Sequence, residues 1–499
     1  MEHPETLPGG RNAKHSVNNN NSNNQISKRS NIMNATTFIR RGLVAALVIF
    51  LISAIGFSQG ILKNGSVVRN TGTITYKEVQ NYKGTAGTIV NSGTFNITGG
   101  SGNLLNQSGA LAGTVKNYIG GQGSGGTIVV AGNIDNNLAG AKIDNDSTGG
   151  FSTIKVAGSI TNAGTFTTTH GRIIYNSAAP QSILLTTYGA LVTDVASAKS
   201  LAAGTTIVND SLRVDGGSTF TVGANTLTLD GATNVTQDGG IFSANAGTVD
   251  YHGDQNQSMI AAQYKTLTLT GATAARTKTS PAGLSFVAAG SLTVDTHDTL
   301  LVASGNLDMS VATTTLANSG VIKVAGNATF NASITSAGTF YYNGALAQNI
   351  GAATYADLVL GNAGSKTFPN GTTAVTGNFT INGGAGARSY GTGTFQFAGT
   401  TGNQAVTNLA ESFYIVQFAG AATKSLTGTA FSANQMDLNN GTGVVTNNVT
   451  TVTLTNVGLV SLTLAAGTEL DNSLGMTINM SGDLQNDGTL VNAGTIGVY

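Results

Sequence analysis

The chain has 499 residues, among them 68 glycines and 5 prolines, and it contains neither cysteine nor tryptophan. The absence of cysteine excludes disulfides, Cys-ligated zinc, iron–sulfur clusters and a thiol nucleophile. Only 9% of the residues are charged and 40% are hydrophobic, and the abundance of Val, Ile, Thr and Leu is sufficient to bury a core of strands.

The N-terminal part carries the pattern of a secretory signal. Residues 43–55 form the apolar run LVAALVIFLISAI, which follows Arg40 and Arg41 and precedes the small residues of GFSQG. The run is short for a membrane span, which needs about 20 residues. A start at Met33 would give a signal peptide of ordinary length, cleaved before Gln59.

Residues 1–58 are therefore predicted to be a leader plus signal peptide, in which residues 1–32 are an over-extended start or a disordered leader. The alternative is an uncleaved N-terminal membrane anchor. Six of the 23 basic and two of the 23 acidic residues lie in 1–58, which leaves 17 basic and 21 acidic residues for the mature chain. This mildly acidic balance argues against nucleic acid as a partner, and the membrane is expected to matter only for the export signal.

A short repeat, Asn-x-Gly-Thr followed by an apolar residue, marks residues 59–170 and returns in residues 441–499. It begins at Asn70, Asn91, Asn162, Asn486 and Asn492, with variants at Asn318 and Ser336. Asn and Gly tolerate the left-handed backbone conformation of a sharp turn, and the Thr and apolar residue that follow favour a strand. Each motif is therefore interpreted as a turn followed by a strand.

Residues 171–440 hold four copies of a longer unit, whose starts are 76, 91 and 55 residues apart. The copies begin at Gly171, Gly247, Gly338 and Gly393. Each contains an aromatic residue, a glutamine, a second aromatic residue and a lysine: Tyr175, Gln181, Tyr188 and Lys199; Tyr251, Gln257, Tyr264 and Lys278; Tyr342, Gln348, Tyr355 and Lys366; Phe397, Gln404, Phe413 and Lys424. These residues keep a constant order while the spacing between copies varies. This predicts that whole strands or coils are inserted between them.

The predicted fold is all-β, a right-handed parallel β-helix or β-solenoid built from Gly/Asn/Thr-rich repeats. Glycine and β-branched residues are too dense for helices, and apolar residues alternate with a period of two. An array of antiparallel β-sandwich repeats is the alternative, because Asn-Gly pairs can also form hairpins. The solenoid is favoured because similar turn–strand units recur along nearly the whole chain, and roughly twenty residues per coil would give about twenty coils.

The leader, the Asn-x-Gly-Thr repeats and the Tyr…Gln…Tyr…Lys unit resemble the repeat regions of large bacterial cell-surface proteins, including β-helical adhesins of the filamentous-haemagglutinin kind. The resemblance covers about residues 60–499 and implies attachment to surfaces or envelope architecture, without naming a ligand. Two departures are the lack of a recognisable sorting or outer-membrane module and of a recognisable cap. An uncapped coil exposes an edge that can pair with another chain, so we expect either a longer protein or an end covered by a partner or by a second copy of the chain.

An enzyme is the main rival, because β-helices also host polysaccharide lyases and hydrolases that need closely placed carboxylates. The acidic pairs are Asp144 with Asp146, Asp250 with Asp254 and Asp295 with Asp298, and His252 and His297 lie beside two of them. All stand among turn-forming residues, where Asp commonly caps the backbone. The Gly-rich stretch 119–126 is interpreted as a flexible turn, and no catalytic, cofactor-binding or metal site is predicted.

Two binding alternatives remain. Thr-x-Thr strands at residues 226–229 and 266–271 would form threonine ladders of the ice-binding kind, but they are irregularly spaced in the sequence. The repeated tyrosines would suit a glycan, although tryptophan, the usual strongest stacking platform, is missing.

The expected function is that of a non-enzymatic structural or adhesion protein, secreted or held at the bacterial cell surface, with an unidentified glycan or matrix protein as ligand. The alternative is a polysaccharide-binding or polysaccharide-degrading β-helix protein. Within the long unit, Tyr342, Tyr355 and Leu358 are expected to fill core layers. Gln348 is expected to form a buried ladder or brace a turn, and Lys366 to mark the solvent edge of a strand.

Overall fold

The computed structural model describes residues 60–82, 86–99, 102–108, 111–118, 125–147, 150–231, 234–331, 334–382, 386–439, 441–456 and 459–499. The predicted leader and signal peptide, and residues 119–124 of the Gly-rich stretch, lie outside these ranges. All described residues belong to one compact unit, Gly56–Tyr499. Their regular elements are all strands, and within these ranges no helix is long and apolar enough to cross a membrane.

The first two coils show how the chain winds. The first contains β1 (Ile61–Lys63), β2 (Val67–Asn70) and β3 (Thr73–Tyr76), and the second contains β4 (Glu78–Gln80), β5 (Thr88–Asn91) and β6 (Thr94–Ile97). Each strand pairs in parallel with its counterpart one coil later: β1 with β4, β2 with β5 and β3 with β6. Each of these coils has three strands, and each strand belongs to a different parallel sheet; farther along the stack, strands of adjacent sheets are joined into long strands such as β44 (Thr423–Leu438).

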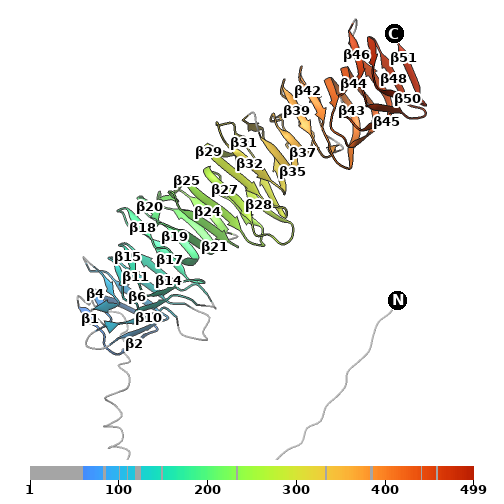
Figure 1. Cartoon of the computed structure of the whole chain (residues 1–499). Helices are drawn as coiled ribbons and strands as arrows, with labels where there is room; N and C mark the ends of the chain where they lie inside the picture. The colour runs from blue at the N-terminus through green and yellow to red at the C-terminus, as the bar shows by residue number, and fades with distance from the viewer. Residues whose placement is uncertain are drawn as a thin grey trace, which may run out of the picture. The chain divides into compact units, whose positions relative to one another are not determined.

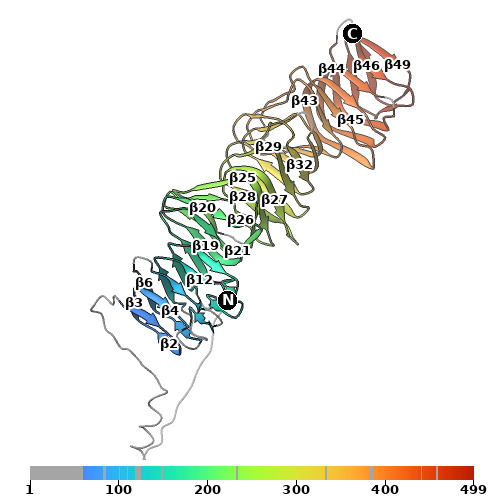
Figure 2. The ribbon, with the colours of Figure 1, turned by 60° about the vertical axis from the view of Figure 1, so that its left-hand side comes forward.

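The same winding continues to the last coil, which contains β49 (Asp483–Asn486), β50 (Thr489–Asn492) and β51 (Thr495–Val498). The stack has about 19 coils, and Figures 1 and 2 show neighbours in sequence as neighbours in space along it. The predicted parallel β-solenoid is confirmed. The antiparallel β-sandwich alternative is wrong, because among the described residues the only antiparallel strand pair is β8 (Gln107–Ser108) with β9 (Leu111–Ala112).

The sheets are continuous where the repeat types change. At residue 170, β14 (Thr153–Val156) pairs in parallel with β17 (Arg172–Tyr175). At residue 440, β44 (Thr423–Leu438) pairs in parallel with β45 (Val444–Leu454). Alternate residues of the strands point inward, and their side chains form one hydrophobic core that extends from Val79 to Met480.

The asparagines of the short repeat stack on one another between coils. Asn70 donates its Nδ2 to Oδ1 of Asn91 at 2.7 Å, and Asn91 donates to Asn117 at 2.7 Å. A second ladder, with distances of 2.6 to 2.9 Å, runs through Asn64, Asn81, Asn106, Asn136 and Asn162. The expected left-handed conformation is wrong, because among the described residues the non-glycine positions with positive φ are Val195, Ala289, Thr313 and Asn362.

The glycine of this motif is required by the close approach of neighbouring coils. A Cβ atom on Gly93 would lie 2.0 Å from the carbonyl oxygen of Gly72, and one on Gly494 would lie 2.2 Å from that of Met476. Neither glycine has a positive φ. Any side chain at these positions would push two coils apart. The glycine of the motif is therefore needed for close contact between coils and not for a special turn conformation.

Substitution of Asn106 tests the asparagine ladder. Its buried Nδ2 donates to Asn136 Oδ1 at 2.7 Å and to the carbonyl oxygens of Gly113 and Lys142 at 3.0 Å each. Asn106→Ala removes the donor from these buried acceptors and should lower the local unfolding free energy by about 2–4 kcal/mol. Hydrogen exchange of the flanking coils measures this loss, with the exposed Asn245→Ala as control. Equal protection in both variants would contradict a stabilising ladder.

Candidate functional site

The four copies of the long unit place their glutamine and lysine side by side on adjacent coils. In the third copy, Gln348 of β36 (Gln348–Asn349) is in register with Lys366 of β38 (Lys366–Thr367). The same registration joins Gln181 with Lys199, Gln257 with Lys278 and Gln404 with Lys424. All four lysines are 0% exposed. The expectation that the lysine marks a solvent edge is therefore wrong.

Of the two roles predicted for the glutamine, a buried ladder and a turn brace, the structure shows the brace of the bend before its strand. Gln348 Oε1 accepts the backbone N–H of Gly344 at 2.8 Å, and its Nε2 donates to the carbonyl of Val324, one coil earlier, at 2.8 Å. Gln404 makes the equivalent contacts with Gly399 N–H at 3.0 Å and with Val375 O at 2.7 Å. The amide thus links a bend to the preceding coil.

The lysine closes the same bend from the following coil. Lys366 Nζ donates to the carbonyl oxygens of Gly344 at 3.2 Å and Gly364 at 2.7 Å, which lie on successive coils. Lys424 Nζ donates to Gly399 O at 3.1 Å and Ala422 O at 2.7 Å. An ammonium group suits this place because it has three donors and no acceptor. We call Lys199, Lys278, Lys366 and Lys424, with the carbonyls that they bind, the lysine clamps.

Burial lowers the pKa of the lysines in the clamps. Desolvation lowers the pKa of Lys199, Lys278 and Lys366 below the usual lysine range, and it lowers the pKa of Lys424 to about 8. Their ammonium groups remain engaged by carbonyls inside the coil, so they are not presented to a ligand.

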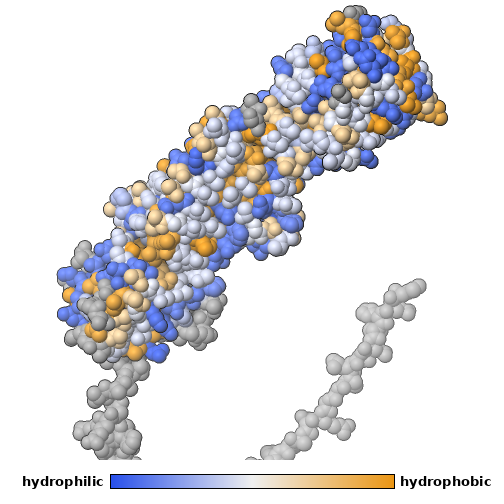
Figure 3. Space-filling model, in the orientation of Figure 1, coloured by the Kyte–Doolittle hydropathy of each residue, from blue (hydrophilic) through white to orange (hydrophobic). Residues whose placement is uncertain are grey.

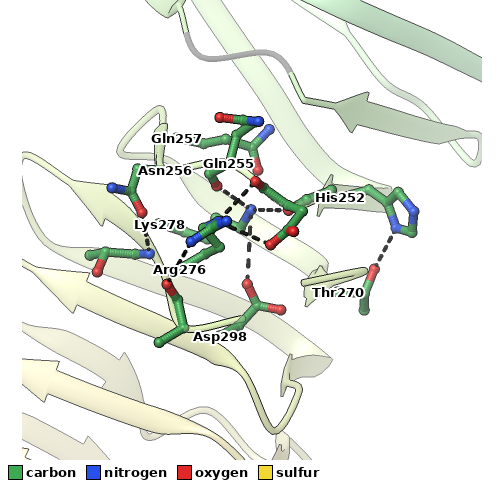
Figure 4. A network of polar contacts seen from close by, with 12 residues as sticks. His252, Gln255, Asn256, Gln257, Thr270, Arg276, Lys278 and Asp298 are labelled. Carbon is green, nitrogen blue, oxygen red and sulfur yellow. Dashed lines mark hydrogen bonds and ion pairs between the residues drawn. The ribbon is translucent and has the colours of Figure 1, made fainter. Parts of the chain in front are cut away.

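The second clamp also contains a buried carboxylate (Figure 4). Lys278, on β28 (Arg276–Ser280), donates to the carbonyls of Gly253 and Gln255 at 2.8 Å each. Its Nζ lies 3.8 Å from Oδ1 of Asp298, the first residue of β30 (Asp298–Val302), and both side chains are 0% exposed. Burial raises the pKa of Asp298, and neither carboxylate oxygen has a hydrogen-bond partner among the described residues.

The repeated tyrosines form hydrogen-bonded pairs inside the core. The hydroxyls of Tyr342 and Tyr355 lie 2.9 Å apart; Tyr342 accepts the N–H of Gly351 at 2.9 Å, and Tyr355 donates to its carbonyl at 2.7 Å. Tyr175 and Tyr188 repeat this arrangement at 3.1 Å. The predicted core placement of Tyr342, Tyr355 and Leu358 is confirmed, since all are 0% exposed and unavailable for stacking on a sugar.

The acidic pairs from the sequence find partners on neighbouring coils. Asp146 accepts the backbone N–H of His170 at 2.6 Å and lies 2.7 Å from its Nδ1. Asp254 forms an ion pair with Arg276 Nε at 3.0 Å. Sequence reasoning missed both partners because they lie a whole coil away, and only the coil length would have found them.

The side chains of Asp250 and His252 lie together, with Asp250 Oδ2 3.6 Å from His252 Nδ1, whereas those of Asp295 and Asp298 point to different sides of the coil although Asp298 N–H donates to Asp295 O at 2.9 Å. Asp250 Oδ1 accepts the hydroxyls of Thr268 at 2.7 Å and Thr270 at 2.8 Å, and His252 Nδ1 lies 3.0 Å from Thr270 Oγ1. Asp298 turns inward to its clamp, whereas Asp295 and His297 are exposed. In the part of the chain that the structure describes, no three His, Cys, Asp or Glu side chains could hold a metal ion together.

No protein-family model, curated protein or solved structure matches this chain. Its function must therefore be inferred from its own surface.

One outward sheet face carries aligned hydroxyl groups. It is formed by β23 (Thr226–Asp230), β25 (Ile241–His252), β27 (Gln263–Thr270), β29 (Leu284–Val294) and β32 (Thr315–Asn318). The pairing aligns one row of Thr226, Thr248, Thr266, Ser291 and Thr315, and beside it a row of Thr228, Asp250, Thr268 and Thr293. We call these two rows the hydroxyl face. The Thr-x-Thr strands, irregular in the sequence, are therefore in register in space, with coils about 4.8 Å apart.

A groove of 670 Å³ lies beside the end of this face. It is lined by Ala312, Thr313, Thr314, Thr315, Leu316, Asn331, Ile334 and Thr335. Two of its polar groups are used internally, because Thr314 Oγ1 donates to Met309 O at 2.6 Å and Asn331 Nδ2 donates to Thr314 O at 3.0 Å. The described lining has no ionisable side chain.

Proposed function

We propose that the chain is an exported, non-enzymatic structural or adhesion protein of the bacterial surface, whose stacked coils present the hydroxyl face to a glycan or matrix polymer. One observation carries this proposal. The polar residues that recur in every long unit are used inside the coils, whereas the hydroxyl rows point outward in a regular array.

A repetitive ligand suits such a face. Threonine and serine hydroxyls donate and accept hydrogen bonds. Some of these bonds lie within the face, because Thr268 donates to Asp250 Oδ1 at 2.7 Å and Ser291 donates to Thr266 Oγ1 at 3.3 Å. Each contact is weak by itself, but many contacts along one polymer act together through their high effective concentration. The array has no metal or nucleophilic constellation among its residues, so its chemistry favours binding.

Binding to immobilised polysaccharides and matrix proteins tests the proposal. The triple variant Thr226→Lys, Thr248→Lys and Ser291→Lys places bulky charges on the first hydroxyl row and should weaken binding by at least about tenfold, or 1.4 kcal/mol. A control variant carries the same substitutions on another outward sheet face, at Thr277, Thr299 and Thr339, and should bind like the wild type. Absence of binding to every surface, or equal loss in both variants, would count against the hydroxyl face. Release of soluble oligosaccharides would instead support the polysaccharide-degrading alternative.

The exported state has a separate test. Mass spectrometry of the protein recovered from outside the inner membrane should show a mature N-terminus at Gln59. An exported chain that retains residue 1 would overturn the cleaved signal peptide.

A further inference from the structure

The described residues contain three Asn-Gly pairs, at residues 64–65, 343–344 and 370–371. An asparagine before glycine deamidates readily in an unstructured chain, because no Cβ atom hinders the glycine nitrogen when it attacks the side-chain carbonyl carbon. The pairs at residues 382–383 and 440–441 each include a residue outside the described ranges. The fold places the three pairs in different surroundings, so they should differ in this reaction.

Two of the pairs are held inside the stack. Asn64 is 3% exposed, and its Nδ2 donates to Asn81 Oδ1 at 2.7 Å and to Thr88 O at 3.1 Å. The nitrogen of the second pair is occupied, because buried Gly344 donates its N–H to Gln348 Oε1 at 2.8 Å. Reaction at either pair therefore requires a local opening of the coils, which lowers the population that can react.

The third pair lies on the surface, in the bend between β38 and β39 (Thr372–Val375). Asn370 and Gly371 are both exposed, and a Cβ atom on Gly371 would meet no heavy atom within 4 Å. On the face shown in Figure 3, the surface around β39 is mostly hydrophilic or of intermediate hydropathy. Among the described residues, none accepts a hydrogen bond from the Gly371 nitrogen. This nitrogen can therefore lose its proton to water without first breaking a hydrogen bond within the protein.

The next coil assists the reaction at the side-chain carbonyl group. The N–H of Thr392 donates to Asn370 Oδ1 at 3.2 Å. Negative charge develops on this oxygen when the Gly371 nitrogen attacks Cγ, and an N–H donor already in place stabilises such charge. At Asn343, in contrast, the buried Oδ1 has no donor among the described residues. Of the three pairs, only the third combines an exposed asparagine with a donor to its side-chain oxygen.

From these observations we propose that Asn370 is a modification site, at which the fold selects spontaneous deamidation. The Gly371 nitrogen forms a bond to Asn370 Cγ, the Cγ–Nδ2 bond breaks, and Nδ2 leaves as ammonia with the proton that the backbone nitrogen gives up. Water then opens the cyclic imide at either of its carbonyl groups, which leaves aspartate or isoaspartate at residue 370. Water is the only co-reactant. The inference goes beyond the proposed function and does not depend on it.

Isoaspartate would change the stack, because it routes the backbone through the former side chain and lengthens the bend. The strands on both sides of the bend are in register with the next coil, Lys366 with Arg388 and Thr372 with Thr394. A longer bend between two fixed strands should loosen this register and the lysine clamp at Lys366. Aspartate keeps the backbone path and the acceptor for the N–H of Thr392, so it should leave the coils intact.

Mass spectrometry of peptides from the folded full chain, incubated in mildly alkaline buffer, tests the site. Deamidation should be at least about tenfold faster at residue 370 than at residues 64 and 343, because these two react only after a local opening. In denaturant the three rates should lie close together, since each pair then has the same reacting groups and no surrounding fold. Gly371→Ala places a Cβ atom where the bend has room for it, and it should slow the reaction at residue 370 severalfold without changing the other two.

Hydrogen exchange of residues 366–397 tests the consequence for the coils. Protein that carries isoaspartate at residue 370, quantified by isoaspartate-specific enzymatic methylation, should exchange severalfold faster there than fresh protein. The matched control is Asn370→Asp, which adds the same charge without the longer backbone and should exchange like the wild type. Equal exchange of the isoaspartate form and of Asn370→Asp would overturn the expected loosening.

The rates decide the proposal itself. Selective reaction at residue 370 in the folded chain, with loss of the selectivity in denaturant, would support it. Equal rates at the three pairs in the folded chain would overturn it, since the fold would then select nothing. An intact Asn370 in the folded chain, under conditions in which the denatured chain reacts at all three pairs, would also overturn it, because the fold would then protect this pair. Failed ligand binding by the hydroxyl face would leave these results unchanged.

Discussion

Replacing Lys278 by methionine is expected to lower the local free energy of unfolding by about 3–5 kcal/mol. The substitution keeps most of the side-chain volume but removes the ammonium that binds Gly253 O and Gln255 O and lies 3.8 Å from Asp298 Oδ1. Two carbonyls then lose their hydrogen-bond donor, and the buried carboxylate of Asp298 loses its neighbouring cation (Figure 4). Because each coil contacts mainly its neighbours, the loss is best measured locally, by hydrogen exchange of residues 253–302.

A set of matched variants separates the ion pair from the clamp. Asp298→Asn alone should change the same free energy by no more than about 1 kcal/mol, because Lys366 and Lys424 hold their bends without a carboxylate. Adding Asp298→Asn to Lys278→Met should recover about 1–2 kcal/mol, since the unpaired buried charge disappears. Lys323→Met, on the outward face of β33 (Val321–Val324), is the control. If Lys278→Met behaves like Lys323→Met, the clamp does not stabilise the stack.

Alkaline solution should unfold the stack steeply above pH 10. Burial raises the pKa of Tyr175 and Tyr251 to about 12, and it raises those of Tyr188, Tyr264 and Tyr355 well above 10. The unfolded chain loses these protons near pH 10 while the folded chain keeps them. The folded state therefore binds more protons, and stability falls as the pH rises from 10 towards 12. A shift of two units corresponds to roughly 2–3 kcal/mol for each such tyrosine.

The lysine clamps have the opposite effect on the pH dependence of stability, and they act at lower pH. The pKa of Lys424 is lowered to about 8 in the folded state, so between pH 8 and 10.5 the unfolded chain binds more protons and stability rises with pH, by an amount of the order given above for one tyrosine. Circular dichroism and tyrosinate absorbance, followed together from pH 7 to 12, should show a shallow rise in stability and then a cooperative loss.

Paired variants identify the groups responsible. Tyr175→Phe with Tyr188→Phe gives the first copy the aromatic residues of the fourth copy, and it should shift the alkaline transition to higher pH. The exposed Tyr414→Phe should leave the transition unchanged. Tyrosinate that forms well before the loss of circular dichroism would show that the hydroxyls are not protected by the fold.

The fold and its core could be predicted because two features are visible in the sequence itself: apolar residues alternate with a period of two, and the aromatic residues of the long unit recur in a constant order. The predicted core placement of Tyr342, Tyr355 and Leu358 is correct for this reason. Lys366 was wrongly predicted because a charged side chain between glycines resembles a strand edge, and only the coil geometry shows carbonyls of two bends converging on its Nζ.

The asparagine ladder could not be predicted, and the hydroxyl face only as an alternative based on two Thr-x-Thr strands, because both features join residues that are a coil apart. Asn64, Asn81 and Asn106 lack the Gly-Thr signature, so only three-dimensional stacking reveals that they belong to one row. Thr248 and Thr266 are neighbours in space, although coils of unequal length hide their register in the sequence. The sequence names no ligand for the proposed binding surface, because no motif in the chain encodes such chemistry.

The lysine clamps also bear on how the stack would respond to mechanical load. Lys366 and Lys424 each bind carbonyls from two successive coils, and these charged hydrogen bonds join one coil to the next in addition to the backbone ladder. A force that separates coils from one end would first break junctions held by the backbone hydrogen bonds between coils. It would then reach a stronger junction wherever a lysine clamp adds charged hydrogen bonds. Four such junctions at unequal intervals would divide the solenoid into segments that unfold one after another, so that the stack would lengthen in steps under load.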